Sequence, residues 1–537
     1  MPGNVTATAV KGIANVMLEA AGGAQVLLAT QAVTATITGF TAPTGSTGMR
    51  LWIKIFAWTT SGTLTISGTG SPGNTETVTI AAPTLQQTQS AQIATYELVS
   101  LNAYTAITNI TTTGLTNGMI TVYGIQAGKY QIPSVLTSNN PRKTYSPNEH
   151  NSFIARDKKI LHLPVNATLD WTQDCYADLS LPWCYLMFGA PVITTFPSTP
   201  TSLFTAAALT ATQSLTTQPS APGMKLILTV TSFSVAGSIT ITGTVNGVAN
   251  VSETIAISAN GTLYSSNVYS AVNASGIVNS GTTATLAITG VFGWNLVFTS
   301  EQPLYSAAVE WFDGTGSWTH PFVIAQEGDF DIKAEQEGKL TFKSKCQDKL
   351  PIGDRTVTPL TGTNRIAALG ANLNDLPIVG WQSAIYLDPI TGTPQTTSYG
   401  SVRELKVSLK VPQEDIFTLN NTQIFSRAYP MKRECLAEGV LDFIDLLQYE
   451  QFRQNLKQYL VCQFLGQMIG NNAGSPLYKS WTWTLPIRVD GNFDVTSDPS
   501  KGNVQAKAMW RAEYDSGIAS AYKLTVITQI PAPIFPN

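Results

Sequence analysis

The chain contains few residue groups whose types and spacing could perform chemistry. Residues 68–73, GTGSPG, fit the pattern G-x-G-x-x-G, which cradles a pyrophosphate when a strand precedes it and a helix follows it. Here an alternating strand pattern follows instead, so no helix N-terminus is expected to face a phosphate. We therefore predict a hairpin turn at this position.

A second group is acidic. Asp490, Asn492 and Asp494 have the alternating spacing of the ligands in a calcium loop. The twelfth position of such a loop is occupied here by Lys501, whereas calcium loops place a bidentate Glu there. The pattern predicts a structural turn, with an ion site as the alternative.

The histidines and cysteines form no pattern typical of catalysis or metal binding. His150, His162 and His320 are far apart in the sequence, and His320 alternates with apolar residues, which predicts a packed or surface side chain. The five cysteines, none of them in a C-x-x-C pair, are Cys175, Cys184, Cys346, Cys435 and Cys462. We expect reduced thiols, and we predict no catalytic, cofactor-binding or metal-binding residue and therefore no enzyme.

Composition limits the classes of function further. Of the 537 residues only 12% are charged, and the formal net charge is −3. A typical soluble protein has about 25% charged residues. This balance argues against a polybasic nucleic-acid-binding protein. No apolar run approaches the ~20 residues of a membrane span, and the N-terminus lacks a signal-peptide pattern, so we expect no membrane segment and synthesis in the cytoplasm.

The C-terminal part of the chain combines strand and helix patterns. Residues 425–443 and 481–489 resemble strands. Between them, apolar residues from Tyr449 to Leu460 fall on one helical face, which predicts a helix that ends near Gly466. Residues 504–530 alternate as closing strands, so we expect one helix packed on a sheet.

Residues 151–345 repeat this order in divergent form. Residues 169–171 correspond to 441–443, and residues 328–332 correspond to 491–495. A short helix is predicted from Pro182 to Phe188. The earlier copy is longer by about 109 residues, close to the ~100 residues of an immunoglobulin-like sandwich, so we expect one inserted module.

Two charge-poor segments, residues 28–127 and 203–293, resemble each other. Residues 48–69 align without a gap onto residues 223–244, and short strand patterns recur along both segments, which predicts two immunoglobulin-like sandwiches. Their charged residues are Arg50, Lys54, Glu76, Glu97, Lys225 and Glu253. This contrast with the rest of the chain marks the domain boundaries.

The pattern of strand, helix, hairpin and closing strands resembles the tail tube proteins of long-tailed bacteriophages. The matching residues are 439–443, the helix to Gly466, 481–489 and 503–528. The resemblance covers about 128–202 and 294–537. It implies a mainly β fold with few helices, containing two tandem tail-tube domains, each a sandwich or barrel-forming sheet plus one helix, and two immunoglobulin-like sandwiches.

We expect the chain to be divided into six parts. The parts are an N-terminal arm or leading strand at 1–27, an immunoglobulin-like domain at 28–127, a first tube domain at 128–202 plus 294–345, an inserted immunoglobulin-like domain at 203–293, a connector at 346–402 and a second tube domain at 403–537. The second sandwich would therefore interrupt the first tube domain.

The resemblance implies a structural virion protein of a siphovirus with a non-contractile tail, made in the host bacterial cytoplasm. Rings would stack into a helical tube that conducts double-stranded DNA without specific binding during genome ejection. Because the tube unit is duplicated, we expect trimeric, pseudo-sixfold rings. Expected partners are the tail terminator, distal tail and tape-measure proteins. The outward-facing modules would contact host-surface glycans weakly or serve as inert decoration.

Two other functions fit parts of the same sequence. One is a surface adhesin built of β-sandwiches that binds glycan or protein, which the two charge-poor modules favour. The other is a distal-tail or tail-completion protein, which forms a single ring and does not polymerise. Self-assembly into long tubes would distinguish a tube protein from an adhesin and from a single-ring tail protein.

Overall fold

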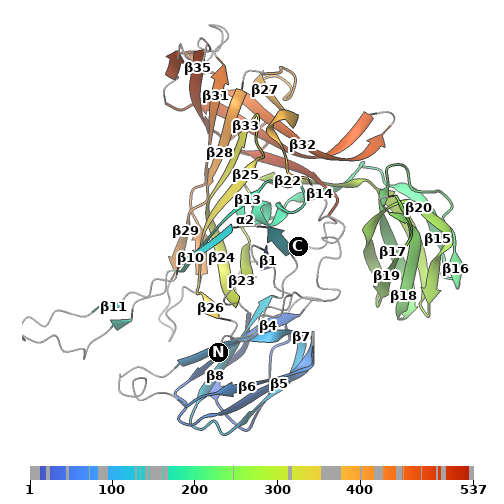
Figure 1. Ribbon diagram of the computed structural model, residues 1–537, viewed down its shortest axis with the longest axis vertical. Helices are drawn as coiled ribbons and strands as arrows, with labels where there is room; N and C mark the ends of the chain where they lie inside the picture. Colours follow the sequence, from blue (N-terminus) through green and yellow to red (C-terminus); the bar gives the residue numbers. More distant parts are fainter. Residues whose placement is uncertain are drawn as a thin grey trace, which may run out of the picture.

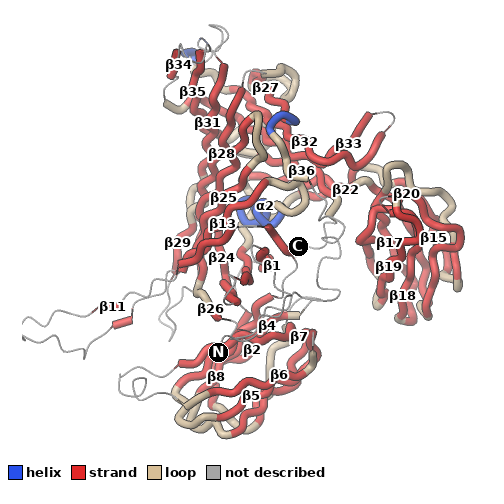
Figure 2. The backbone as a smooth tube through the Cα atoms, viewed as in Figure 1, coloured by secondary structure: helices blue, strands red, loops and turns tan. Residues whose placement is uncertain are grey.

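Strands dominate the computed structural model, and helices are few (Figure 2). The structure describes residues 13–19, 25–43, 48–71, 73–82, 95–126, 130–133, 135–139, 144–145, 161–162, 167–245, 247–312, 317–351, 376–399, 402–416, 427–442, 450, 453–472, 475–491, 494–497 and 504–530. The predicted fold class, mainly β with few helices, is confirmed. Figure 1 shows a tall central sheet, called the body below, with two compact strand modules, one beneath it and one at its side.

The two modules have the same strand topology. The first contains β2 (Gln25–Ala32), β3 (Thr36–Ile37), β4 (Met49–Phe56), β5 (Gly62–Ser71), β6 (Thr75–Ile80), β7 (Thr95–Thr113) and β8 (Met119–Gln126). The second contains β15 (Thr201–Ala208), β16 (Thr212–Gln213), β17 (Met224–Val235), β18 (Gly237–Val245), β19 (Val248–Ile257), β20 (Gly261–Ser280) and β21 (Thr283–Val291). The orders β2-β8-β4-β7-β5-β6 and β15-β21-β17-β20-β18-β19 correspond strand for strand.

One long strand folds each module into two layers. In the first module, β7 pairs with β4 over its first half and with β5 over its second half. Side chains from both layers meet in one core, in which Ile53 and Ile55 of β4 pack with Leu64 and Ile66 of β5. A sheet folded over its own core in this way is a β-sandwich, as the regular spacing of short strands predicts.

The body contains the remaining long strands. They are β1 (Ile13–Glu19), β9 (Tyr130–Pro133), β10 (Val135–Asn139), β13 (Ala167–Asp174), β14 (Val192–Phe196), β22 (Gly293–Thr299), β23 (Ser306–Phe312), β24 (Ser317–Lys333), β25 (Lys339–Cys346), β26 (Leu350–Pro351), β27 (Ser383–Pro389), β28 (Val402–Lys410), β31 (Glu434–Asp442), β32 (Gln458–Asn472), β33 (Ser475–Val489), β34 (Asp494–Ser497), β35 (Val504–Ala512) and β36 (Lys523–Thr528). Two small hairpins accompany them, β11 (Thr144–Tyr145) with β12 (Leu161–His162) and β29 (Gln413–Ile416) with β30 (Arg427–Pro430).

Antiparallel pairing joins these strands into one branched sheet. The longest path runs β10-β13-β25-β24-β28-β31-β35-β33-β36-β22-β14. Strands β23, β1 and β9 branch from β24, and strands β32 and β27 branch from β33. Among the described strands no pairing closes this path, so the sheet is open, with β10 and β14 at its ends.

The two segments predicted to be copies of one unit contribute the same three-strand order. In the first copy β13 pairs with β25, which pairs with β24, and in the second β31 pairs with β35, which pairs with β33. Strand β28 pairs with both β24 and β31 and so joins the copies. The correspondence between 328–332 and 491–495 fails in detail, because Gly328 lies inside β24 whereas Gly491 occupies a turn with a φ of +103°.

Both modules are inserted between strands that pair with each other. The first module lies between β1 and β9, where Val16 is opposite Tyr130. The second lies between β14 and β22, where Phe196 is opposite Gly293. Each module therefore leaves and re-enters the body at adjacent points, which lets the body sheet continue past the insertion.

The short helix predicted from Pro182 to Phe188 is α2 (Leu181–Phe188). Pro182 suits its first turn, because proline lacks the N–H that would have no partner there. Gly189 ends the helix with a φ of +91° and donates its N–H to the carbonyl oxygen of Tyr185. A Cβ at this position would lie 1.9 Å from the carbonyl oxygen of Pro303, so the turn requires glycine.

The predicted helix ending near Gly466 is wrong. Tyr459 and Leu460 lie in β32, which continues to Asn472, and helical residues precede it only at 450 and 453–454 among those described. The segment is also apolar on its other face, where Val461 is buried. A segment that is apolar on both faces satisfies helical and strand patterns alike, and pairing with β27 and β33 selects the strand.

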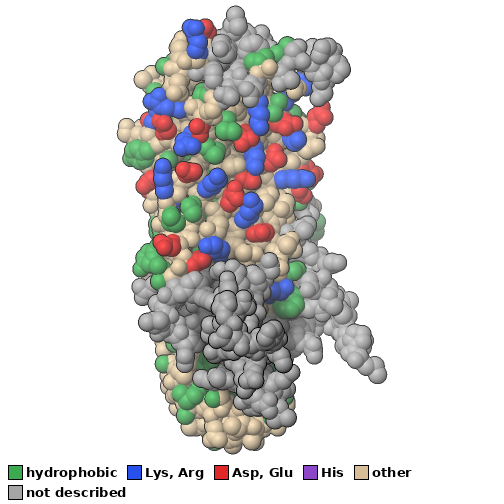
Figure 3. Space-filling model, turned by 90° about the vertical axis from the view of Figure 1, so that its left-hand side faces the viewer, with side chains coloured by type: hydrophobic (Ala, Val, Ile, Leu, Met, Phe, Trp, Pro, Cys, Tyr) green, Lys and Arg blue, Asp and Glu red, His purple; other side chains and the backbone are tan. Residues whose placement is uncertain are grey.

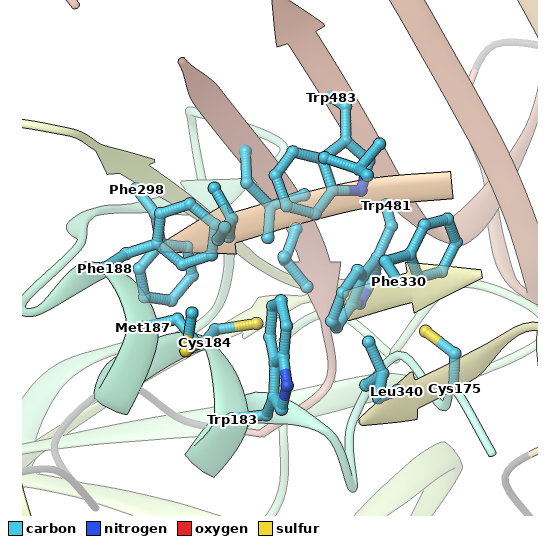
Figure 4. Close-up of a cluster of buried hydrophobic side chains, with 14 of the residues drawn as sticks. Cys175, Trp183, Cys184, Met187, Phe188, Phe298, Phe330, Leu340, Trp481 and Trp483 are labelled. Atoms are coloured by element: carbon cyan, nitrogen blue, oxygen red, sulfur yellow. The ribbon is translucent and has the colours of Figure 1, made fainter. Parts of the chain in front are cut away.

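Helix α2 lies in the largest apolar core of the molecule. All eight of its residues are buried. The ring centroids of Trp183 and Trp481 are 5.9 Å apart, and those of Phe188 and Trp483 are 5.6 Å apart (Figure 4). The first copy therefore supplies a helix whose aromatic side chains pack on the tryptophan strand of the second copy.

This packing predicts that truncating Trp183 of α2 strongly lowers the free energy of unfolding. Trp183→Ala should lower the free energy of unfolding of the body by about 3–5 kcal/mol, because it leaves a cavity beside Trp481. Trp381→Ala is the matched control, since Trp381 is 73% exposed and its loss should cost at most about 0.5 kcal/mol. Scanning calorimetry measures both, and equal shifts would contradict a core centred on α2.

Candidate functional surface: the charged face of the body sheet

The glycine-rich segment belongs to a β-hairpin: Gly68 to Ser71 end β5, and Pro72 lies outside the described residues. It connects β5 to β6, and no helix follows it. The N–H of Gly68 donates to the carbonyl oxygen of Asn74 at 2.9 Å, and the N–H of Gly70 donates to Oδ1 of Asn74 at 3.1 Å. These amides are used within the turn, so they do not form a phosphate cradle.

The acidic group near Asp490 is also a turn where the structure describes it. Oδ2 of Asp490 lies 2.8 Å from Nε of Arg511, and Asp494 begins β34. Asn492 and Lys501 lie outside the described residues. Within the described part of the chain, no group of three His, Cys, Asp or Glu side chains is arranged to hold a metal ion.

His320 and the five cysteines occupy buried positions. His150 lies outside the described residues, and His162 lies in β12. His320 is buried and stacks on Trp311, and burial lowers its pKa to about 3, with a smaller contribution from Lys349, so the ring is neutral near pH 7. All five cysteines are buried, and none of them forms a disulfide. Burial raises the pKa of Cys184, Cys346, Cys435 and Cys462, which makes these thiols poor nucleophiles.

No helix among the described residues is long and apolar enough to cross a membrane.

The surface with the clearest organisation is the outer face of the body sheet, which Figure 3 shows as a dense mixture of cationic and anionic side chains. Six neighbouring strands form it, in the order β13, β25, β24, β28, β31 and β35. We call it the charged face.

The two faces of this part of the sheet differ because the side chains alternate along each strand. Along β28, Leu405, Val407 and Leu409 are buried in the core, while the intervening residues point outward. Strand β31 has the same strict alternation from Glu434 to Asp442. Since α2 and the core cover one face, the polar residues of every strand gather on the other.

Charge on this face alternates from strand to strand. Acidic strands flank basic ones, so that most charges face an opposite charge across the sheet. The outward residues are Asp170 and Asp174 on β13, Lys339, Lys343 and Lys345 on β25, Glu327, Asp329 and Asp331 on β24, Lys406 and Lys410 on β28, Glu434, Glu438 and Asp442 on β31, and Lys507 and Arg511 on β35. The exceptions, Lys333 and Glu404 at adjacent strand ends, pair with each other at 3.3 Å.

Cross-strand ion pairs follow from this alternation. Nitrogen–oxygen distances are 2.8 Å for Lys343–Glu327, 3.1 Å for Lys406–Asp329 and 3.6 Å for Lys507–Glu438. The hydrogen bond and charge of Glu327 raise the pKa of Lys343, so this lysine stays cationic. Each exposed pair contributes only about 0.2–1 kcal/mol to stability. Their combined effect is to leave the face without a cluster of unpaired cations.

A surface of this kind binds polyanions poorly. Nucleic acid binds non-specifically when Lys and Arg side chains replace the counterions around its phosphates. On the charged face, neighbouring carboxylates already neutralise lysines such as Lys343 and Lys406, so these lysines are not available to neutralise phosphates. The arrangement therefore allows a polyanion to pass close to the sheet without being held.

Comparison with known proteins adds little to this geometry. No family model matches the chain, and no curated protein matches its sequence. One solved structure that is similar in part is described as "Crystal structure of PBSX exported protein XepA", with 11% sequence identity, 53% of this chain and 88% of that chain covered, and a TM-score of 0.12. A TM-score this low supports no conclusion about fold or function.

Removing the acidic partners should convert the charged face into a nucleic-acid-binding surface. The triple variant Glu327→Gln, Asp329→Asn, Glu438→Gln should bind duplex DNA at low salt, and the affinity should fall steeply between about 50 and 200 mM salt. Fluorescence anisotropy of labelled DNA measures this binding.

The matched control removes the lysines of the same three ion pairs, with Lys343→Gln, Lys406→Gln and Lys507→Gln, and it should bind no DNA. If the unsubstituted chain binds duplex DNA as tightly as the triple variant without the acidic partners, the carboxylates do not neutralise the cations and the interpretation is wrong.

Proposed function

We propose that the chain is a structural protein of a long-tailed bacteriophage, which stacks as rings into a non-contractile tail tube. The observation that carries the proposal is a single open sheet in which the order β13-β25-β24 recurs as β31-β35-β33, with a charge-balanced outer face and an apolar face covered by α2. The protein would be made in the host bacterial cytoplasm and would reside in the virion tail.

In this proposal the charged face lines the bore. A conduit for double-stranded DNA must not retain phosphates during ejection, and strand-by-strand neutralisation of lysines meets that requirement. The second module lies on the side of the body opposite the charged face (Figures 1 and 3). An outward position for it is consistent with this placement, since a domain of that size inside the bore would block it.

The open ends of the sheet fit assembly into a ring. Strands β10 and β14 end the longest pairing path, and an edge strand presents N–H and C=O groups that a neighbouring chain can pair with. Because each chain carries two copies of the unit, three chains would complete a pseudo-sixfold ring. Tail terminator, distal tail and tape-measure proteins would contact the finished tube, and the modules would contact host glycans weakly or decorate the outside.

The test is negative-stain microscopy of the purified full chain, together with the mass of its rings. Long tubes with three chains per ring and outward knobs are the expected result. Isolated rings that never stack would favour a distal-tail or tail-completion protein. A stable monomer at high concentration would contradict the tube proposal and favour a β-sandwich adhesin, and six chains per ring would contradict the duplicated unit.

A further inference from the structure

The two modules share more than topology. In each, one carboxylate accepts hydrogen bonds from two successive backbone amides at the bend of the long strand: Glu76 from Leu101 and Asn102, and Glu253 from Ser266 and Asn267. These residues occupy corresponding places in β6 and β19, and in β7 and β20. The modules are therefore two versions of one structure, and differences between them are informative.

Both modules contact the body through the same face. In the first, Trp52 of β4 and Ile125 of β8 pack with Ala308 of β23 and Leu350 of β26. In the second, Ile227 of β17 joins the body core, and Ile227 is the residue that aligns with Trp52. We call this surface the docking face.

Both docking faces carry a buried cation at one aligned position, Arg50 in the first module and Lys225 in the second, but the two side chains have different partners. Arg50 is 2% exposed and its Nη1 lies 2.8 Å from Oε1 of Glu310 on β23 of the body, whose side chain is 0% exposed. Lys225 instead donates to the carbonyl oxygens of Ser265 and Ser266 within its own module.

The geometry of the first pair is that of an ion pair more than of a hydrogen bond. Nη1 of Arg50 and Oε1 of Glu310 are 2.8 Å apart, but the orientation of the two groups is poor for a hydrogen bond. A shift of the module that separates the two charges while both side chains stay buried is strongly unfavourable. In the second module, Asp178 of the body lies near Lys225 but is already paired with Lys479 at 2.7 Å.

We propose that Arg50 and Glu310 form a lock that sets the position of the first module on the body, whereas among the described residues no buried ion pair joins the second module to the body. The two modules are thus attached by equivalent faces but positioned differently, the first by a buried charge pair across the boundary and the second by apolar contact and its two chain connections. This inference does not depend on the proposed function.

The test measures module position in the full chain by double electron–electron resonance. Spin labels at Thr79→Cys in β6 and Thr172→Cys in β13 report the distance between the first module and the body, and both sites are exposed. Arg50→Met should raise the ratio of displaced to docked modules about a hundredfold, because Glu310 is left buried without its partner.

The double variant Arg50→Met, Glu310→Met should return the module to its docked position, because neither buried charge remains. Lys225→Met is the matched control, and it should leave the distance between the first module and the body unchanged. An unchanged narrow distance in Arg50→Met would overturn the proposal. Loss of the calorimetric transition of the module itself would also overturn it, because the pair would then support folding rather than position.

Discussion

The body depends on one apolar contact, the burial of α2 against strands from distant parts of the chain. A helix with eight buried residues has no polar stripe for water, so it is stable only where other elements cover it on every side. Trp183 and Phe188 of the first copy meet Trp481 and Trp483 of the second. This contact makes one core from two halves of the chain and fixes which face of the sheet is covered.

The opposite face is therefore free of packing constraints, and its character follows from electrostatics. Apolar residues such as Val407 face the core, and the intervening positions carry charge. Like charges directly opposite on neighbouring strands repel, whereas opposite charges attract. Alternating acidic and basic strands satisfy this rule across the sheet, and the same alternation removes the free cations that would hold nucleic acid.

The modules follow a different physical principle, since they are added at points where the body chain already folds back on itself. Pairing of β1 with β9 and of β14 with β22 brings the two connections of each module together. The body sheet is continuous without them. Each module then lies on the body through its docking face, where Arg50 of the first module pairs with Glu310 of the body and the aligned Lys225 of the second bonds within its own module.

Features with a local cause were determined by the sequence alone. A strand-like run predicted β31, alternation predicted β35, Pro182 and Gly189 bounded α2, and the turn residues at 68–73 predicted a hairpin. Tertiary structure alone decided β32, because its segment is apolar on both faces and only pairing with β27 and β33 distinguishes strand from helix. Tertiary structure also produced the charged face, because lysines and carboxylates neutralise each other only where their strands are neighbours in the sheet. The sequence of one strand does not specify its neighbours.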